Sequence, residues 1–238
     1  MPTEVSKGLP IAETFHSIQG EGTYVGTPMH FIRLAGCPVG KKATGEFHDR
    51  QEVGAYPLPI YPSKCKTWDG RTFVCDTDFS CHTYKTVDEL IGETWEKHIC
   101  LTGGEPLIHQ KSLLEQGFFQ AAWVRGIKIH IETSGTVMLI PQLRDHRWWI
   151  TVAPKWDCKK EMLELADEIK LLIDEDWDEL KWEQLSGPII THTTNIFVSP
   201  INEEKTVNQE NVGLALAVLR SHPTWRLSCQ WHKFLNLR

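Results

Sequence analysis

The sequence lacks the features of a membrane or exported protein. No apolar run in its 238 residues approaches the ~20 residues that a membrane-spanning helix needs. The opening stretch, MPTEVSKGLP, lacks the apolar core of a signal peptide. We therefore expect a cytoplasmic protein with no membrane partner.

An excess of positive charge is lacking too. The net charge is −6 and the isoelectric point is near 6.0, which argues against a protein that binds nucleic acid through its phosphates. There is no internal repeat and no low-complexity tract. A hydrophobic content of 41% is ordinary for a soluble globular protein, and the length suits one α/β domain.

Closely spaced cysteine pairs of the C-x2-C type, which zinc sites commonly use, are also missing. The seven cysteines are an odd number, which together with the expected compartment argues against a disulfide framework. Cys100 and Cys229 lie in apparent strands and are expected to be buried packing residues. Three thiolates can hold a [4Fe–4S] cluster and leave one iron open, but spacing alone leaves the metal undecided. The cysteines that remain as candidate metal ligands lie in one region without regular periodicity: Cys37, Cys65, Cys75 and Cys81.

What the sequence does contain is an alternation of strand and helix patterns. Most predicted strands run into a polar loop with Gly or Pro, which is typical of a parallel β/α sheet or partial barrel. The strands number six or seven, fewer than the eight of a closed barrel. The segment 38–70 has no sustained periodicity and is predicted to be a long loop insertion. The predicted strands are 29–35, 99–101, 128–131, 148–152, 168–173, 195–198 and 226–230, and the predicted helices are 86–98, 111–124, 159–166, 177–185 and 208–221.

Three of these strand ends carry polar motifs. They are Thr102–Pro106 (TGGEP), Glu132–Gly135 (ETSG) and Ala153–Lys155 (APK). Taken alone, each motif is as compatible with a structural turn or a helix cap as with a ligand-binding loop. Because the carboxyl ends of parallel strands share one edge, the three together predict a ligand-binding rim.

The order of motifs along the chain resembles the radical S-adenosylmethionine superfamily, and more narrowly the 7-carboxy-7-deazaguanine synthase family. The resemblance is carried by FHSIQGEGTYVGTPMHFIRLAGCPVG, CDTDF, LTGGEPLIH, IETSG, APK, ADEIK and WRLSCQWHKFLNLR. It implies one radical S-adenosylmethionine domain over 1–238, with an irregular cluster-loop insertion at about 38–74. The fold expected is a partial TIM-type β/α barrel with parallel strands.

The resemblance also implies an activity. Members of the family are lyases that convert 6-carboxy-5,6,7,8-tetrahydropterin to 7-carboxy-7-deazaguanine by radical ring contraction with loss of ammonia. The reaction belongs to 7-deazapurine (queuosine, preQ0) biosynthesis. The implied cofactors are a [4Fe–4S] cluster, S-adenosyl-L-methionine and Mg²⁺. The implied partners are the pterin substrate, an electron donor such as flavodoxin and a second copy of the chain in a homodimer.

Laid on this sequence, the resemblance assigns a role to individual positions. Cys37 and Cys75 correspond to the first and last cluster ligands, and Thr77 to the threonine beside Mg²⁺. The expected S-adenosylmethionine contacts are Val74, Cys75, Asp76, Gly104, Ser134, Ala153, Pro154, Lys155, Ser199, Pro200, Ile201 and Asn202. The expected substrate contacts are Ile18, Gln19, Gly20, Glu21, Arg33, Thr102, His232 and Arg238.

The middle cluster ligand departs from the family pattern. In the usual spacing CxxxCxxC, Lys41 and Thr72 stand where cysteines are expected. Cys65 lies between the two other ligands and is the expected replacement, with Cys81 as the rival. A degenerate cluster is the third possibility.

Two other functions stay open. One is a radical enzyme that acts on another substrate, for example an activase. The other is a non-catalytic metal-binding protein, supported by the missing close cysteine spacing. The pocket residues and the terminal motif favour the synthase.

Overall fold

A computed structural model describes residues 8–39, 63–75, 77–80, 82–143, 148–187, 195–202 and 206–237. In these ranges the strands are β1 (Leu9–Ile18), β2 (Pro28–Leu34), β3 (Ser63–Lys66), β4 (Thr72–Cys75), β5 (Thr83–Lys85), β6 (His98–Gly103), β7 (Lys128–Thr133), β8 (Trp148–Val152), β9 (Glu168–Ile173), β10 (Ile196–Pro200) and β11 (Arg226–Leu227). The α-helices are α2 (Val87–Glu93), α3 (Gln110–Glu115), α4 (Phe118–Val124), α5 (Lys160–Glu164), α6 (Glu179–Ser186), α7 (Gln209–Ser221) and α8 (Trp231–Phe234). Short 3₁₀ turns occur at η1 (Gly22–Tyr24), η2 (Pro106–His109) and η3 (Pro141–Leu143).

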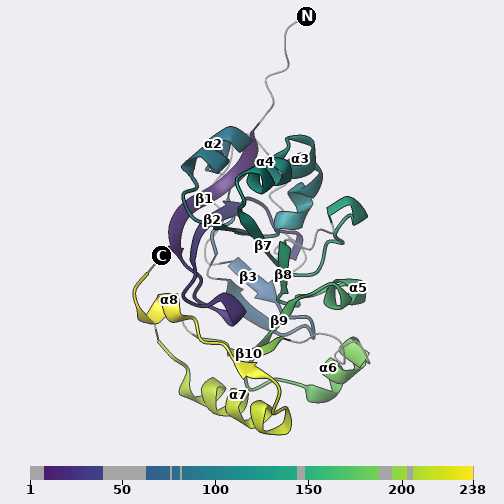
Figure 1. Ribbon diagram of the computed structural model, residues 1–238. Coiled ribbons are helices and arrows are strands. Elements are labelled where there is room, and N and C mark those ends of the chain that lie inside the picture. The colour runs from purple at the N-terminus through teal and green to yellow at the C-terminus, as the bar shows by residue number, and fades with distance from the viewer. Residues whose placement is uncertain are drawn as a thin grey trace, which may run out of the picture.

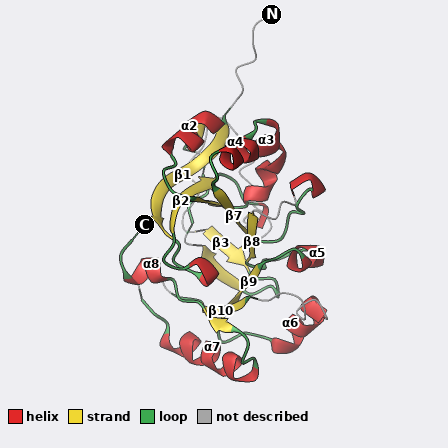
Figure 2. Ribbon diagram, in the orientation of Figure 1, coloured by secondary structure: helices red, strands yellow, loops and turns green. Residues whose placement is uncertain are grey.

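The main sheet has nine strands in the order β11-β10-β9-β8-β7-β6-β2-β1-β5. From β2 to β11 all pairings are parallel, while β1 and β5 extend one edge in antiparallel fashion. In Figure 1 the sheet curves round the middle of the molecule, and Figure 2 shows helices α2 to α7 on its outside. Since β11 and β5 do not pair with each other, the described sheet is an open, partial barrel. The predicted α/β partial barrel is confirmed.

The apolar residues of the parallel strands hold the helices to the sheet. One large cluster of buried side chains joins the strands to the helices, and it includes Ile32, Leu101, Ile131 and Trp182. Burial of a side chain of this size stabilises a fold by about 1.5–3 kcal/mol. The strand ends that carry polar motifs are therefore fixed by a packed layer behind them.

Several local predictions are confirmed in detail. Thr86 caps α2 through a capping box with Glu89, as the T-x-x-E pattern predicts. Asn208 accepts from Asn211 N at the start of α7. These caps satisfy backbone N–H groups that have no partner within the helix.

Other elements differ from the predictions. The predicted helix 111–124 is two helices, because Gly117 adopts a positive φ of 76° between α3 and α4. The strand β1 was not predicted; it pairs with β2, and Phe15 stacks on Phe31 with ring centroids 4.9 Å apart. The predicted strand 226–230 ends at Leu227, and α8 follows it. Among the described residues, no helix is both long enough and apolar enough to cross a membrane.

Candidate active site

A cavity of about 590 Å³ opens at the carboxyl ends of the parallel strands. Most of the residues assigned by the sequence line it, and they come from segments that span nearly the whole chain. Pro154 does not line it, and Asp76 and Arg238 lie outside the described residues. The predicted residues that line the cavity are Ile18, Gln19, Gly20, Glu21, Arg33, Cys37, Cys65, Val74, Cys75, Thr77, Thr102, Gly104, Ser134, Ala153, Lys155, Ser199, Pro200, Ile201, Asn202 and His232.

Two of the cavity thiols come from a β-hairpin inside the segment predicted to be irregular. Strands β3 and β4 pair antiparallel, with Cys65 opposite Phe73 and Ser63 opposite Cys75. Residues two apart on a strand point to the same face, so both thiols lie on one side of the hairpin as diagonal neighbours. The prediction of an irregular insertion over about 38–74 is therefore wrong for Ser63–Lys66 and for 72–74, which form the two strands of the hairpin. Residues 40–62 lie outside the described ranges.

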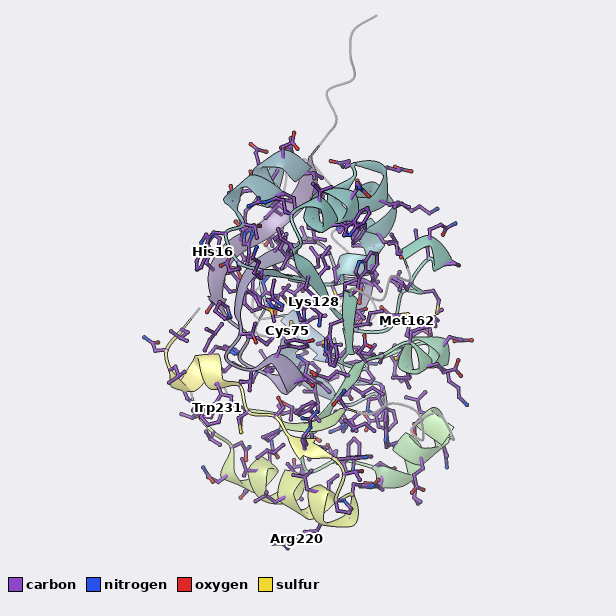
Figure 3. The ribbon with its side chains drawn as sticks, in the orientation of Figure 1. His16, Cys75, Lys128, Met162, Arg220 and Trp231 are labelled. Carbon is purple, nitrogen blue, oxygen red and sulfur yellow. The ribbon has the colours of Figure 1, made fainter. Side chains whose placement is uncertain are left out.

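The third thiol, Cys37, joins these two in a small buried cluster that also contains Val39, Phe73 and Phe79. The loop that carries Cys37 is held against the segment after β4, because Gly36 N donates a hydrogen bond to Phe79 O at 2.8 Å. Cys75, labelled in Figure 3, lies near the centre of that view, within the curve of the sheet. The fold thus brings the first, middle and last predicted ligands to one wall of the cavity.

The thiols on this wall are the type of donor that an iron–sulfur cluster uses. None of the six described cysteines forms a disulfide. In the described part of the chain, no three His, Cys, Asp or Glu side chains are grouped to hold one metal ion. The three thiolates of a [4Fe–4S] cluster each bind a different iron, so they surround a volume and do not converge on a point.

The thiol of Cys65 is protonated in the metal-free chain. Burial raises its pKa to about 11, although the nearby Lys155 ammonium lowers it. A metal that bound at this thiol would therefore displace a proton. The rival ligand Cys81 lies outside the described residues, so the two positions are not compared directly.

Close backbone packing positions Cys37. A Cβ added at Gly104 would lie 2.2 Å from Gly36 O and 2.6 Å from Cys37 Cβ. Only glycine fits at this contact, which brings the TGGEP loop against the cysteine loop. Glu105 N also donates to Gly36 O at 2.9 Å.

Glu105 is buried and joins two of the strand-end motifs. Its carboxylate accepts from Leu107 N, from Thr133 Oγ1 and from the backbone and hydroxyl of Ser134. Burial raises its pKa, and these hydrogen bonds oppose the rise. In the structure this carboxylate therefore anchors the loop after β6 to the loop after β7.

A buried ionic network forms another part of the cavity wall. Lys170 Nζ lies 2.6 Å from Glu21 Oε2 and 3.6 Å from Glu132 Oε1. Gln19 Nε2 donates to Glu132 Oε1 at 3.0 Å. Burial favours protonation of Glu21, but the Lys170 ammonium outweighs it and lowers the pKa of Glu21 to about 2. Glu21 is therefore ionised at neutral pH.

Sequence reasoning missed Lys170 and gave Glu132 no site role beyond its place in a rim motif. Both alternate with apolar residues on β7 and β9, and the motif ADEIK contains Lys170. A charged residue on one face of a strand whose other face is apolar, as Ile169 and Leu171 are on β9, was the available signal. Arg33 also differs from expectation: its Nε donates to Glu13 Oε1 at 2.9 Å, so part of its guanidinium already has a partner.

The terminal segment meets the loop after β1 at the mouth of the cavity. Trp231 N donates to Gly20 O at 3.1 Å, and Gly22 N donates to Ser228 Oγ at 3.2 Å. A Cβ at Gly20 would clash with the ring of His232, so glycine permits this approach. Figure 3 places Trp231 on α8, beside the open side of the sheet.

The chain is similar along nearly its whole length to known enzymes, although no protein-family model matches it. A 7-carboxy-7-deazaguanine synthase from Synechocystis is 31% identical over 234 residues, which cover 96% of this chain and 93% of that protein. The 7-carboxy-7-deazaguanine synthase from Escherichia coli K12 is 30% identical and covers 96% of this chain and 98% of its own length. The crystal structure of QueE from Escherichia coli superposes with a TM-score of 0.62 at 27% identity and covers 94% of both chains.

Proposed function

The chain belongs to the 7-carboxy-7-deazaguanine synthase family, and we propose that it catalyses the formation of 7-carboxy-7-deazaguanine. The substrate is 6-carboxy-5,6,7,8-tetrahydropterin, the ring contracts with loss of ammonia, and the product enters queuosine-type 7-deazapurine biosynthesis. The observation that carries the proposal is the cavity, which gathers the family motifs from both ends of the chain and from successive strand ends.

Cys37, Cys65 and Cys75 would hold the [4Fe–4S] cluster, and their common wall is what supports this assignment. With S-adenosylmethionine, such a cluster supplies the one-electron chemistry that starts a radical reaction. The chain itself binds and orients the reactants and excludes water. The residues proposed to bind S-adenosylmethionine come from β4 and the position after it, from the loops after β6, β7 and β8, and from the end of β10 and the residues that follow it: Val74, Cys75, Asp76, Gly104, Ser134, Ala153, Pro154, Lys155, Ser199, Pro200, Ile201 and Asn202.

The substrate contacts follow from the polar side of the cavity. Glu21 is ionised and accepts hydrogen bonds, which suits the N–H groups along a pterin edge. Arg33 retains guanidinium donors besides the Nε that serves Glu13, and these suit the substrate carboxylate. The other proposed substrate contacts are Ile18, Gln19, Gly20, Thr102, His232 and Arg238.

Mg²⁺ would bind beside the substrate at Thr77. The hydroxyl supplies one oxygen ligand, and Mg²⁺ keeps several waters when protein ligands are few. Thr77 lines the same cavity as Glu21 and Arg33, which supports the placement. A homodimer, a flavodoxin-type electron donor and a cytoplasmic location are further predictions from the family.

Product analysis tests the proposed function. The anaerobically purified protein should be brown. With dithionite, S-adenosylmethionine and the tetrahydropterin it should yield 5′-deoxyadenosine together with 7-carboxy-7-deazaguanine. 5′-Deoxyadenosine without the deazaguanine would refute the substrate.

Iron counting tests the middle ligand. Cys65→Ala should lose the cluster, whereas Cys81→Ala should keep it, with Cys229→Ala as the control for a thiol outside the cavity. The opposite result for the first two variants would assign the cluster to Cys81. Stoichiometric zinc without iron in anaerobic protein would instead favour a non-catalytic metal-binding protein.

A further inference from the structure

The β3–β4 hairpin, which carries two of the cavity thiols, reverses direction through a compact turn. Thr67 N donates to Arg71 O at 2.9 Å, and Gly70 N donates to Thr67 O at 3.0 Å. Gly70 has a positive φ of 93°, which permits the tight turn. Asp69 accepts a hydrogen bond from Thr67 Oγ1 within the same turn. The turn is therefore a single folded unit that orients both strands of the hairpin.

Arg71 joins this turn to a different part of the chain. Its Nε donates to Asp69 Oδ2 at 2.7 Å inside the turn, while Nη1 pairs with Asp174 and Nη2 donates to Leu172 O at 3.1 Å. Leu172 lies on β9 and lines the cavity, and Asp174 follows that strand. One guanidinium thus bridges the hairpin and the carboxyl end of β9, two segments that lie close together in Figure 1.

The bridge is buried and its geometry is specific for arginine. The side chain of Arg71 is 9% exposed and that of Asp69 is 1% exposed. A hydrogen-bonded ion pair shielded from water resists separation, because each partner would be left with an uncompensated charge. The planar guanidinium serves two carboxylates and a carbonyl at the same time, whereas a lysine ammonium lacks this fixed fork.

Trp68 adds an apolar contact beside the bridge. Its ring meets Trp177 and Trp182 edge to face, with ring centroids 6.0 and 5.5 Å away. Trp182 lies on α6 and is fully buried. The guanidinium of Arg71 also lies 5.9 Å from the centroid of the Trp177 ring. The turn of the hairpin is therefore docked on the barrel by packing as well as by charge.

This docking decides where two proposed cluster ligands lie. Cys65 comes shortly before the turn and Cys75 shortly after it, on strands that pair in register. Cys37 is far from both in sequence, so no short connection fixes its distance to them. Contacts between the hairpin and the rest of the fold must set that distance, and the Arg71 bridge is a buried, charged contact of this kind.

We propose that Arg71 is a positioning residue for the cluster. It holds the β3–β4 hairpin against the carboxyl end of β9 and so keeps Cys65 and Cys75 at the distance from Cys37 that three ligands of one cluster need. Arg71 does not line the cavity, so it acts through the hairpin. The inference rests on the proposed function, because that function assigns these thiols to one cluster.

Thiol labelling of the metal-free full chain tests the docking without the cluster. The variants Arg71→Met and Asp174→Ala are treated with N-ethylmaleimide under native conditions, and mass spectrometry of the peptides gives the labelling rates of Cys65 and Cys100. Cys100 is fully buried on β6 and reports general loosening of the fold. Arg125→Met is the matched control, since that guanidinium also joins two segments, through backbone carbonyls at the end of α2.

In Arg71→Met the labelling rate of Cys65 should rise at least about tenfold relative to that of Cys100, because local opening of the hairpin leaves the sheet intact. Asp174→Ala should give a selective rise as well, and Arg125→Met should leave the ratio within about twofold of the parent. Arg71→Lys should restore part of the protection, since it keeps the charge but not the fork.

An unchanged ratio in Arg71→Met, or an equal rise at both cysteines, would overturn the proposal. If Arg71→Met does not fold, as judged by circular dichroism, the ratio in Asp174→Ala decides in the same way.

Iron retention tests the consequence for the cluster. After anaerobic reconstitution, Arg71→Met should lose iron to EDTA at least about tenfold faster than the parent, whereas Arg125→Met should lose it at the parental rate. Iron loss at the parental rate in Arg71→Met would overturn the positioning role. A parent that binds no iron would refute the proposed cluster, and the labelling ratio would still test the docking of the hairpin.

Discussion

Replacing Lys170 with Met should destabilise the protein more than the substitution of an ordinary polar residue on a strand. The ammonium is buried and lies against Glu21 and Glu132, with Glu168 also in its field. Methionine has a similar length and no charge. The substitution therefore leaves at least two carboxylates without their cation in a largely buried wall of the cavity.

The expected magnitude follows from the electrostatics. Lowering the pKa of Glu21 from 4.5 to about 2 corresponds to about 3 kcal/mol of native-state stability at neutral pH. Removing one member of a buried ion pair typically costs about 3–5 kcal/mol, because the remaining charge is uncompensated. We expect a loss of about 3–5 kcal/mol for Lys170→Met at pH 7.5.

The loss should depend on pH in a defined direction. The folded-state pKa of Glu21 is depressed, so its stabilisation is complete above the unfolded value of 4.5 and vanishes as the pH falls through about 2. Without Lys170 the carboxylates bind protons at higher pH, which relieves the buried charge. The variant should therefore lose less stability relative to the parent at pH 5 than at pH 7.5.

Anaerobic urea unfolding followed by circular dichroism measures both effects. Lys181→Met is the matched control, since Lys181 is exposed and its pair with Asp178 spans 3.5 Å; it should cost less than about 1 kcal/mol. A loss below about 1 kcal/mol for Lys170→Met, or the same loss at both pH values, would refute the electrostatic account.

Further predictions concern the cysteine loop and the buried histidines. Gly104→Ala should lose most of the iron, because its Cβ would overlap Gly36 O and Cys37 Cβ, whereas Gly92→Ala on α2 has open space and should keep its iron and melt at the same or a higher temperature. Full iron occupancy in Gly104→Ala would contradict the packing argument. Burial lowers the pKa of His30 to about 4 and of His130 to about 3, so folding stability should fall by about 2 kcal/mol per histidine between pH 7 and pH 5 as the unfolded chain takes up protons. In urea unfolding across this range, the free energy of unfolding should fall less steeply with decreasing pH in His130→Gln than in the parent protein. An unchanged slope would show that His130 does not carry the effect.

The elements that sequence predicted well have a strong local signal. The parallel strands β8 and β9 match their predicted bounds, because short apolar runs between polar turns have few alternatives. The N-terminal cap of α2 could also be predicted from the sequence, since Thr86 and Glu89 interact within one helical turn.

The elements that were missed depend on partners far along the chain. Strand β1 has polar residues at several positions and is held by pairing with β2 and β5 on its two sides. The β3–β4 hairpin packs its apolar positions around thiols, so its sequence shows no clear hydrophobic alternation. For the site, motif order located most of the cavity lining. The ion-pair partners of Lys170, Glu21 and Glu132, come from the loop after β1 and from β7, and the sequence alone does not show that these segments meet β9.

The contact between Trp231 and Gly20 has a consequence for the order of synthesis. The two residues are joined by a backbone hydrogen bond at 3.1 Å although nearly the whole chain separates them. During synthesis the loop after β1 leaves the ribosome early. The wall of the cavity that this loop forms with the C-terminal segment is completed only when that segment has been made. Until then the nascent chain exposes an unfinished sheet edge, which is the kind of surface that chaperones retain and that aggregates when synthesis outpaces folding. Truncated chains that end before Ser228 should therefore be retained by chaperones or aggregate, even though they contain most of the barrel.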